Sequence, residues 1–76
     1  MNTKMALHEV EVELNNATAR FGPMVSPHEG LAIIMEEFEG LKAEVFKKKE
    51  QRNVYRMREE AAHVAAMAIR FISDLC

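Results

Sequence analysis

The strongest constraint on the fold is the spacing of apolar residues, which recur every three or four positions in three segments. An α-helix turns once in about 3.6 residues, so this spacing gathers the side chains on one face of a helix. The positions are Leu7, Val10, Leu14, Ala17 and Phe21; Ile34, Met35, Phe38, Leu41 and Val45; and Met57, Ala61, Val64, Ala68, Phe71 and Leu75. We therefore predict an all-α chain with three helices, over about residues 3–20, 27–49 and 53–75.

One short stretch allows a different interpretation. The residues "VEVEL", Val10 to Leu14, alternate between apolar and acidic as in a half-buried strand. No other part of the chain offers a partner strand, and only three Gly and two Pro interrupt the 76 residues. Composition and pattern together favour helix at this position.

The helix boundaries carry local signals of different strength. Gly22 and Pro23 predict a turn, and Ser26 to Glu29 have the order of a capping box with proline in the first helical turn. The polar stretch Lys47 to Asn53 contains neither Gly nor Pro, so it does not force a turn. We predict a hairpin with a break near residues 51–53; the alternative is one helix from Pro27 to the C-terminus that finds its partners in other chains.

The chain is short enough to limit its organisation and its partners. Its 76 residues form one domain, 1–76, and bury barely enough apolar surface to offset their conformational entropy. We therefore expect a homodimer or a tetramer. The net charge of −2 makes nucleic acid an unlikely partner.

Localisation signals are sparse. No apolar run reaches the roughly 20 residues that span a bilayer, so we expect no membrane association. The one cysteine, Cys76, cannot form an internal disulfide, which suits a reducing cytoplasm.

Four carboxylates interrupt the second apolar segment, within "IIMEEFEGLKAE": Glu36, Glu37, Glu39 and Glu44. At about 100° per residue, Glu37 and Glu44 flank the apolar face, whereas Glu36 projects nearly opposite it. These carboxylates do not converge on one point, and Mg²⁺ requires oxygen ligands in near-octahedral geometry. A metal site would therefore need residues from another helix.

The third segment offers such residues in Glu60 and His63, which lie along one edge of the predicted helix. Two simpler interpretations stay open: an ion pair of Glu60 with Arg56 one turn earlier, and hydrogen-bonded packing of His63. The cations between Lys47 and Arg58 suit either phosphate binding or a solvated helix end.

Two stretches of the chain, "FGPMVSPHEGLAIIMEEFEGLKAEV" and "MREEAAHVAAMAIRF", resemble the short MazG-like proteins of phages and bacteria. These belong to the all-α nucleoside triphosphate pyrophosphohydrolases. The resemblance implies a helical dimer or dimer of dimers that binds Mg²⁺, with Mn²⁺ as a substitute. It also implies hydrolysis of a nucleoside triphosphate to the monophosphate and pyrophosphate.

The family motif is E-E-x-x-E on one helix and E-x-x-D on the next. Glu36 and Glu37 match the opening pair, and Glu60 matches the start of the second half. Gly40 stands where the third glutamate belongs, and His63 stands where the aspartate belongs.

Carried over to the matching positions, the resemblance implies that Glu37 and Glu60 are the catalytic metal ligands. Glu36, Glu39 and His63 would complete the metal site, and an imidazole ligand favours ions softer than Mg²⁺. Apart from the motif, the cluster of cations leads us to expect Lys47 and Arg56 at the phosphates, because Lys supplies a point charge and Arg a forked donor.

Three functional hypotheses follow. The first is a divergent pyrophosphohydrolase that cleaves (d)NTP. The second is a helical interaction module that kept the family's fold and dimer and lost its catalysis. The third, which needs no family, is a coiled-coil-like dimer with solvated charges.

Overall fold

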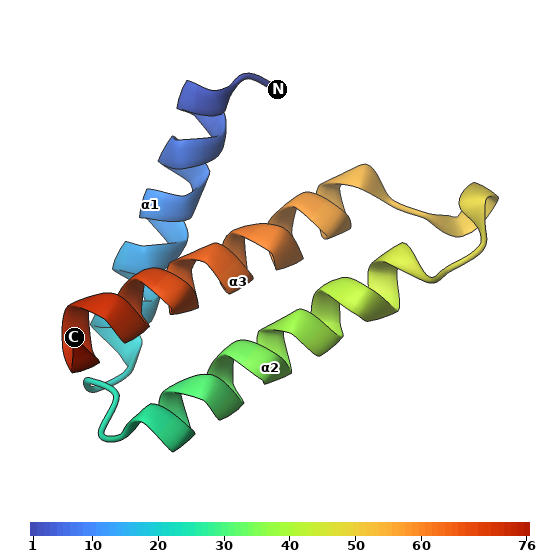
Figure 1. Cartoon of the computed structure of the whole chain (residues 1–76). Helices are drawn as coiled ribbons and strands as arrows, with labels where there is room; N and C mark the ends of the chain where they lie inside the picture. Colours follow the sequence, from blue (N-terminus) through green and yellow to red (C-terminus); the bar gives the residue numbers. More distant parts are fainter.

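The structure, a computed structural model, describes all residues 1–76 and contains helices without any strand. The elements are α1 (Thr3–Arg20), α2 (Pro27–Val45), the short 3₁₀ helix η1 (Lys49–Gln51) and α3 (Val54–Leu75). In Figure 1, α2 and α3 lie side by side as a hairpin and α1 crosses α3. The all-α prediction is confirmed, and the strand interpretation of Val10 to Leu14 is wrong because these residues lie inside α1.

The first two helices begin where the sequence places cap residues. The Asn2 side chain accepts a hydrogen bond from the Met5 amide at 2.8 Å. Ser26 accepts from the Glu29 amide at 3.2 Å, and the Glu29 carboxylate accepts from the Val25 amide at 3.3 Å. These bonds satisfy amides that have no partner inside a helix. Ser26 caps α2 as predicted, whereas Glu29 bonds the Val25 amide, one residue before the amide that a capping box uses.

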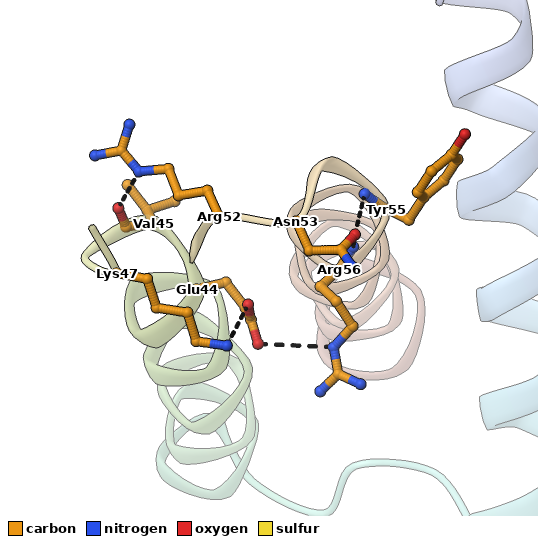
Figure 2. A network of polar contacts seen from close by, with 7 residues as sticks. All are labelled: Glu44, Val45, Lys47, Arg52, Asn53, Tyr55 and Arg56. Atoms are coloured by element: carbon orange, nitrogen blue, oxygen red, sulfur yellow. Dashed lines mark hydrogen bonds and ion pairs between the residues drawn. The ribbon is translucent and has the colours of Figure 1, made fainter. Parts of the chain in front are cut away.

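A break between α2 and α3 confirms the hairpin and excludes the continuous helix. The predicted end of the second helix at Lys49 is wrong, because α2 ends at Val45 and Lys49–Gln51 form η1. The Arg52 Nε donates to the Val45 carbonyl at 2.8 Å, so a side chain satisfies an exposed helix end without Gly or Pro. Asn53 then caps α3 by accepting from the Tyr55 and Arg56 amides (Figure 2).

The helices approach closely at the open end of the hairpin. A Cβ atom added to Gly30 on α2 would lie 2.7 Å from a ring carbon of Phe71 on α3. Glycine at this position therefore lets the two helix axes come near each other. The core itself is small, because its buried members are Ala17, Met24, Ala66 and Met67.

The loop between α1 and α2 is tied to the end of α3. The Met24 amide donates to Asp74 at 2.9 Å, and the Arg70 guanidinium donates to the Gly22 carbonyl at 2.5 Å. These two bonds hold the loop beside α3 and bury the Met24 side chain.

None of the helices is both long enough and apolar enough to cross a membrane.

Candidate metal centre

Three predicted site residues meet between α2 and α3. Ligand atoms of Glu37, Glu60 and His63 all lie within 4.8 Å of one another. The His63 Nδ1 lies 3.4 Å from a Glu37 oxygen and 3.7 Å from a Glu60 oxygen. All three side chains are about two thirds buried or more, so the cluster faces the interior edge of the hairpin.

Gly40 gives the Glu60 carboxylate its space. A Cβ atom added to Gly40 would lie 2.5 Å from Oε2 and 3.1 Å from Cδ of Glu60. Ordinary carbon contacts begin about 3.5 Å apart, so any side chain at position 40 must displace this carboxylate. The absence of a side chain at Gly40 therefore admits the Glu60 carboxylate to the cluster.

Glu13 on α1 joins the cluster, and sequence reasoning missed it. The Nε2 atom of His63 lies 3.0 Å from a Glu13 carboxylate oxygen. The imidazole thus touches carboxylates from all three helices. The signal that could have found Glu13 is its place three residues after Val10 and four before Ala17, at the edge of the buried face of α1.

One carboxyl group of the cluster, that of Glu37, has a shifted pKa. Burial raises the pKa of the Glu37 carboxyl above its ordinary value of 4.5. His63 opposes this rise in pKa, whereas neighbouring carboxylates add to it, those of Glu60, Glu36 and Glu13. An accumulation of negative charge in a partly buried place favours binding of a proton or of a cation.

The cluster opens into a cleft of about 600 Å³ between α1, α2, α3 and the α1–α2 loop. Acidic groups line it together with His63, and two cations also reach it, Arg20 and Arg70. Its apolar lining comes from Ala17, Phe21, Met24, Ile33 and Met67. Only 6% of Arg70 is exposed, and its guanidinium lies 3.9 Å from Asp74. One cleft therefore offers carboxylates, guanidinium groups and an apolar wall.

Glu36 and Glu39 differ in their placement. Glu36 lines the cleft beside Glu37, although it does not belong to the three-residue cluster. Glu39 is exposed and lines neither the cleft nor the cluster. The rotation of about 100° per residue separates these neighbours.

The predicted phosphate contacts, Lys47 and Arg56, lie at the other end of the hairpin. Their side chains approach the buried Glu44 carboxylate, at 3.0 Å for Lys47 Nζ and 3.6 Å for Arg56 Nε (Figure 2). Neither residue lines the cleft. The ion pair of Glu60 with Arg56, considered above as a simpler explanation for Glu60, is wrong. Arg56 approaches the Glu44 carboxylate on α2 instead.

The donor set fits a divalent cation. Two carboxylates and an imidazole nitrogen converge, a glycine provides the space, and two further carboxylates lie nearby. Carboxylate oxygens suit Mg²⁺ and Mn²⁺, and the nitrogen donor suits Mn²⁺ better.

Searches against family models, curated proteins and solved structures find no match to this chain.

Proposed function

We propose that the chain is a divergent MazG-like nucleoside triphosphate pyrophosphohydrolase that converts (d)NTP to (d)NMP and pyrophosphate. The observation that carries the proposal is the convergence of Glu37, Glu60 and His63 within 4.8 Å, beside a cleft that also contains two arginines. The resemblance of the α2 and α3 sequences to the family supplies the reaction. The geometry supplies the site.

The metal ligands in this proposal are Glu37, Glu60 and the Nδ1 of His63. Glu36 contributes negative charge from the adjacent position, and Glu39 has at most an indirect role because it lies outside the cleft. A bound Mg²⁺ or Mn²⁺ supplies Lewis acidity to the phosphoryl group and acidifies a bound water.

Glu13 positions His63 for this task. Its carboxylate oxygen lies 3.0 Å from Nε2, close enough to accept the N–H of that nitrogen. This contact leaves the Nδ1 lone pair directed toward Glu37 and Glu60. Carboxylates that orient ligating histidines in this way are a common feature of metal sites.

Two cations, Arg20 and Arg70, reach the cleft, but the buried Arg70 already donates to the Gly22 carbonyl, so Arg20 is the one available to the substrate phosphates. Both line the cleft, whereas the predicted pair Lys47 and Arg56 neutralises Glu44. A guanidinium group donates two parallel hydrogen bonds to a phosphate. The apolar wall, which includes Phe21, gives the sugar and base a surface to pack on.

The remaining predictions belong to the same proposal. We propose that the protein acts as a homodimer or tetramer in a reducing cytoplasm, where the exposed thiol of Cys76 stays free. The opposing formal charges, with 10 Lys and Arg against 12 Asp and Glu, give no reason to propose a nucleic acid partner.

The test is a direct assay for products. Purified protein is mixed with Mg²⁺ or Mn²⁺ and a panel of standard and modified (d)NTPs, and release of pyrophosphate and monophosphate is measured. We expect Glu37→Gln and Glu60→Gln to abolish release, while Glu11→Gln on the exposed side of α1 retains it. No release from any substrate, together with no metal-dependent rise in melting temperature, contradicts the proposal.

One observation favours the second candidate, a helical interaction module without catalysis. The two nitrogens of His63 lie 3.0–3.7 Å from carboxylates on all three helices, so the imidazole can hold the cluster together without a metal ion. In such a module, metal does not raise the melting temperature of the native chain. The variant His63→Asp, which restores the motif aspartate, would then gain a metal-dependent rise. The third hypothesis, solvated charges on a coiled coil, does not account for the partly buried Glu37 with its raised pKa.

A further inference from the structure

The closed end of the α2–α3 hairpin carries most of the cations of the chain. Residues 42–58, which we call the hairpin tip, contain seven of the ten Lys and Arg residues and two glutamates, a formal charge of +5. The rest of the chain contains three Lys and Arg residues against ten Asp and Glu residues, a formal charge of −7. The net charge of −2 therefore conceals a basic tip and an acidic body.

The cations of the hairpin tip are all exposed, and some of them have no counter-ion. Lys47 and Arg56 approach Glu44, and Arg58 pairs with a carboxylate on α1. The other four lie beyond ion-pair distance of any carboxylate: Lys42, Lys48, Lys49 and Arg52. The helix dipole attracts cations within the last turn of α2, and Arg52 caps that helix. Neither role accounts for two free lysines beyond the helix end, at positions 48 and 49.

Two apolar side chains are exposed among these cations. Phe46 directly follows α2 and is 75% exposed, and Val54, the first residue of α3, is 64% exposed. The Lys42 Nζ lies 5.7 Å from the centre of the Phe46 ring. In Figure 1 this end of the hairpin projects away from α1 and from both termini. The hairpin tip thus combines free positive charge with apolar area that the chain itself does not cover.

We propose that the hairpin tip docks on the anionic surface of a lipid bilayer. Lysine and arginine side chains near such a surface are attracted by its negative potential. Apolar side chains beside them are stabilised at the boundary between headgroups and acyl chains. A bilayer surface therefore satisfies both the free cations and the pair Phe46 and Val54. Docking at a surface needs no spanning helix, so the absence of one does not oppose it.

The separation of charge along the molecule orients this contact. The molecule is 40 Å long, and Glu37 of the acidic cluster precedes Phe46 by nine residues, about 13 Å along α2. The Debye length at physiological ionic strength is about 8 Å, so a surface touched by the tip repels these carboxylates only weakly. A contact through the acidic body would instead be repelled. The molecule should therefore meet the bilayer tip first.

This inference stands apart from the proposed enzyme activity. No residue of the hairpin tip lines the cleft, which lies toward the open end of the hairpin beside the α1–α2 loop. Docking through the tip leaves the cleft open to solvent. A module without catalysis would dock in the same way.

Single-stranded nucleic acid, the other common polyanion, fits the hairpin tip less well. Proteins that bind it stack successive bases on neighbouring aromatic rings. The two rings of the tip face different sides: Tyr55 lines a small cleft beside α1, whereas Phe46 lies about 160° around α2 from the buried Glu44. Val54 has no ring on which a base could stack. A bilayer accommodates an aromatic and an aliphatic side chain alike.

A fluorescence experiment tests the docking directly, because the chain contains no Trp. Phe46→Trp places a single indole at the tip. We expect its emission to shift to the blue with vesicles of phosphatidylcholine and phosphatidylserine, and to stay unchanged with phosphatidylcholine alone. Leu7→Trp, at an exposed position on α1, is the matched control and should show no shift. Added salt should weaken the binding.

Charge variants in the Phe46→Trp chain measure the electrostatic part. Lys48→Gln should weaken binding to the anionic vesicles about fivefold, and the double variant with Lys49→Gln about 30-fold. Lys4→Gln removes one exposed cation from α1 and should leave the affinity unchanged. These side chains are exposed and make no ion pair, so the variants should fold, which circular dichroism checks.

Four results overturn the proposal. They are no shift with anionic vesicles, an equal shift with phosphatidylcholine alone, full affinity of the double lysine variant, and binding of a single-stranded oligonucleotide in place of vesicles. The last of these results would assign the hairpin tip to nucleic acid.

Discussion

Replacing Gly40 by alanine should stabilise the fold and damage the site, two effects of opposite sign from one methyl group. Alanine inside a helix is about 1 kcal/mol more favourable than glycine. For a domain of this size we expect a rise in melting temperature of about 4–8 °C. The packing around position 40 does not oppose this gain, because the nearest atom is the flexible end of the Glu60 side chain.

The loss comes from displacement of the Glu60 carboxylate. The new Cβ would lie 2.5 Å from Oε2, so the carboxylate must move by about 1 Å to reach an ordinary contact distance. A displacement of about 1 Å in a catalytic group can cost on the order of 100-fold in rate. This factor corresponds to about 2.7 kcal/mol of transition-state stabilisation. We therefore expect Gly40→Ala to lower kcat/KM about 100-fold and to weaken metal binding.

Circular dichroism melts and the pyrophosphate assay measure the two effects on the same sample. Gly22→Ala is the matched control, because a Cβ at Gly22 meets no atom within 4 Å. If Gly40→Ala keeps native metal binding and native activity, the position of the Glu60 carboxylate is not what Gly40 provides, and the reasoning is refuted.

Three further predictions concern the electrostatics of the cluster and of the hairpin end. Because the pKa of Glu37 is raised in the folded chain, the protonated carboxyl contributes to the free energy of unfolding below pH 4.5. This contribution is lost as the pH rises through the raised pKa. Glu37→Gln should therefore be more stable than the native metal-free chain at pH 7 and show no such gain at pH 4, as measured by urea denaturation. Glu13→Gln should weaken Mn²⁺ binding about 10–100-fold in calorimetry, because it removes the carboxylate that orients His63; unchanged affinity would leave Glu13 without a role. Arg56→Gln should lower the free energy of unfolding by about 1 kcal/mol through its lost contact with the buried Glu44, and KM should not change. A raised KM would instead support the predicted phosphate contact.

The sequence predicts most of the secondary structure because its signals are local. Apolar spacing, Ser26 with Glu29, and Gly22 with Pro23 act within one or two turns of the chain. The end of α2 was missed because it depends on Arg52, whose side chain reaches back seven residues to the Val45 carbonyl. A polar segment without Gly or Pro gives no sign of such a bond in advance.

The candidate site was predicted in part for a related reason. Glu37, Glu60 and His63 lie at helix positions that the motif aligns, and the close pairing of α2 and α3 brings them together. Glu13, Arg20 and Arg70 were not assigned to the site, since their approach depends on how α1 and the following loop cross the hairpin. Such a crossing angle has no local signature in a sequence.

The sequence by itself determined three amphipathic helices, the cap at Ser26 and a resemblance in the α2 and α3 segments, since each depends on residues within a few positions of one another. Only the tertiary structure decided which carboxylates share a cleft, that Lys47 and Arg56 contact Glu44, and that the space at Gly40 admits Glu60. These outcomes depend on distances between helices, which the packing of side chains far apart in the chain sets.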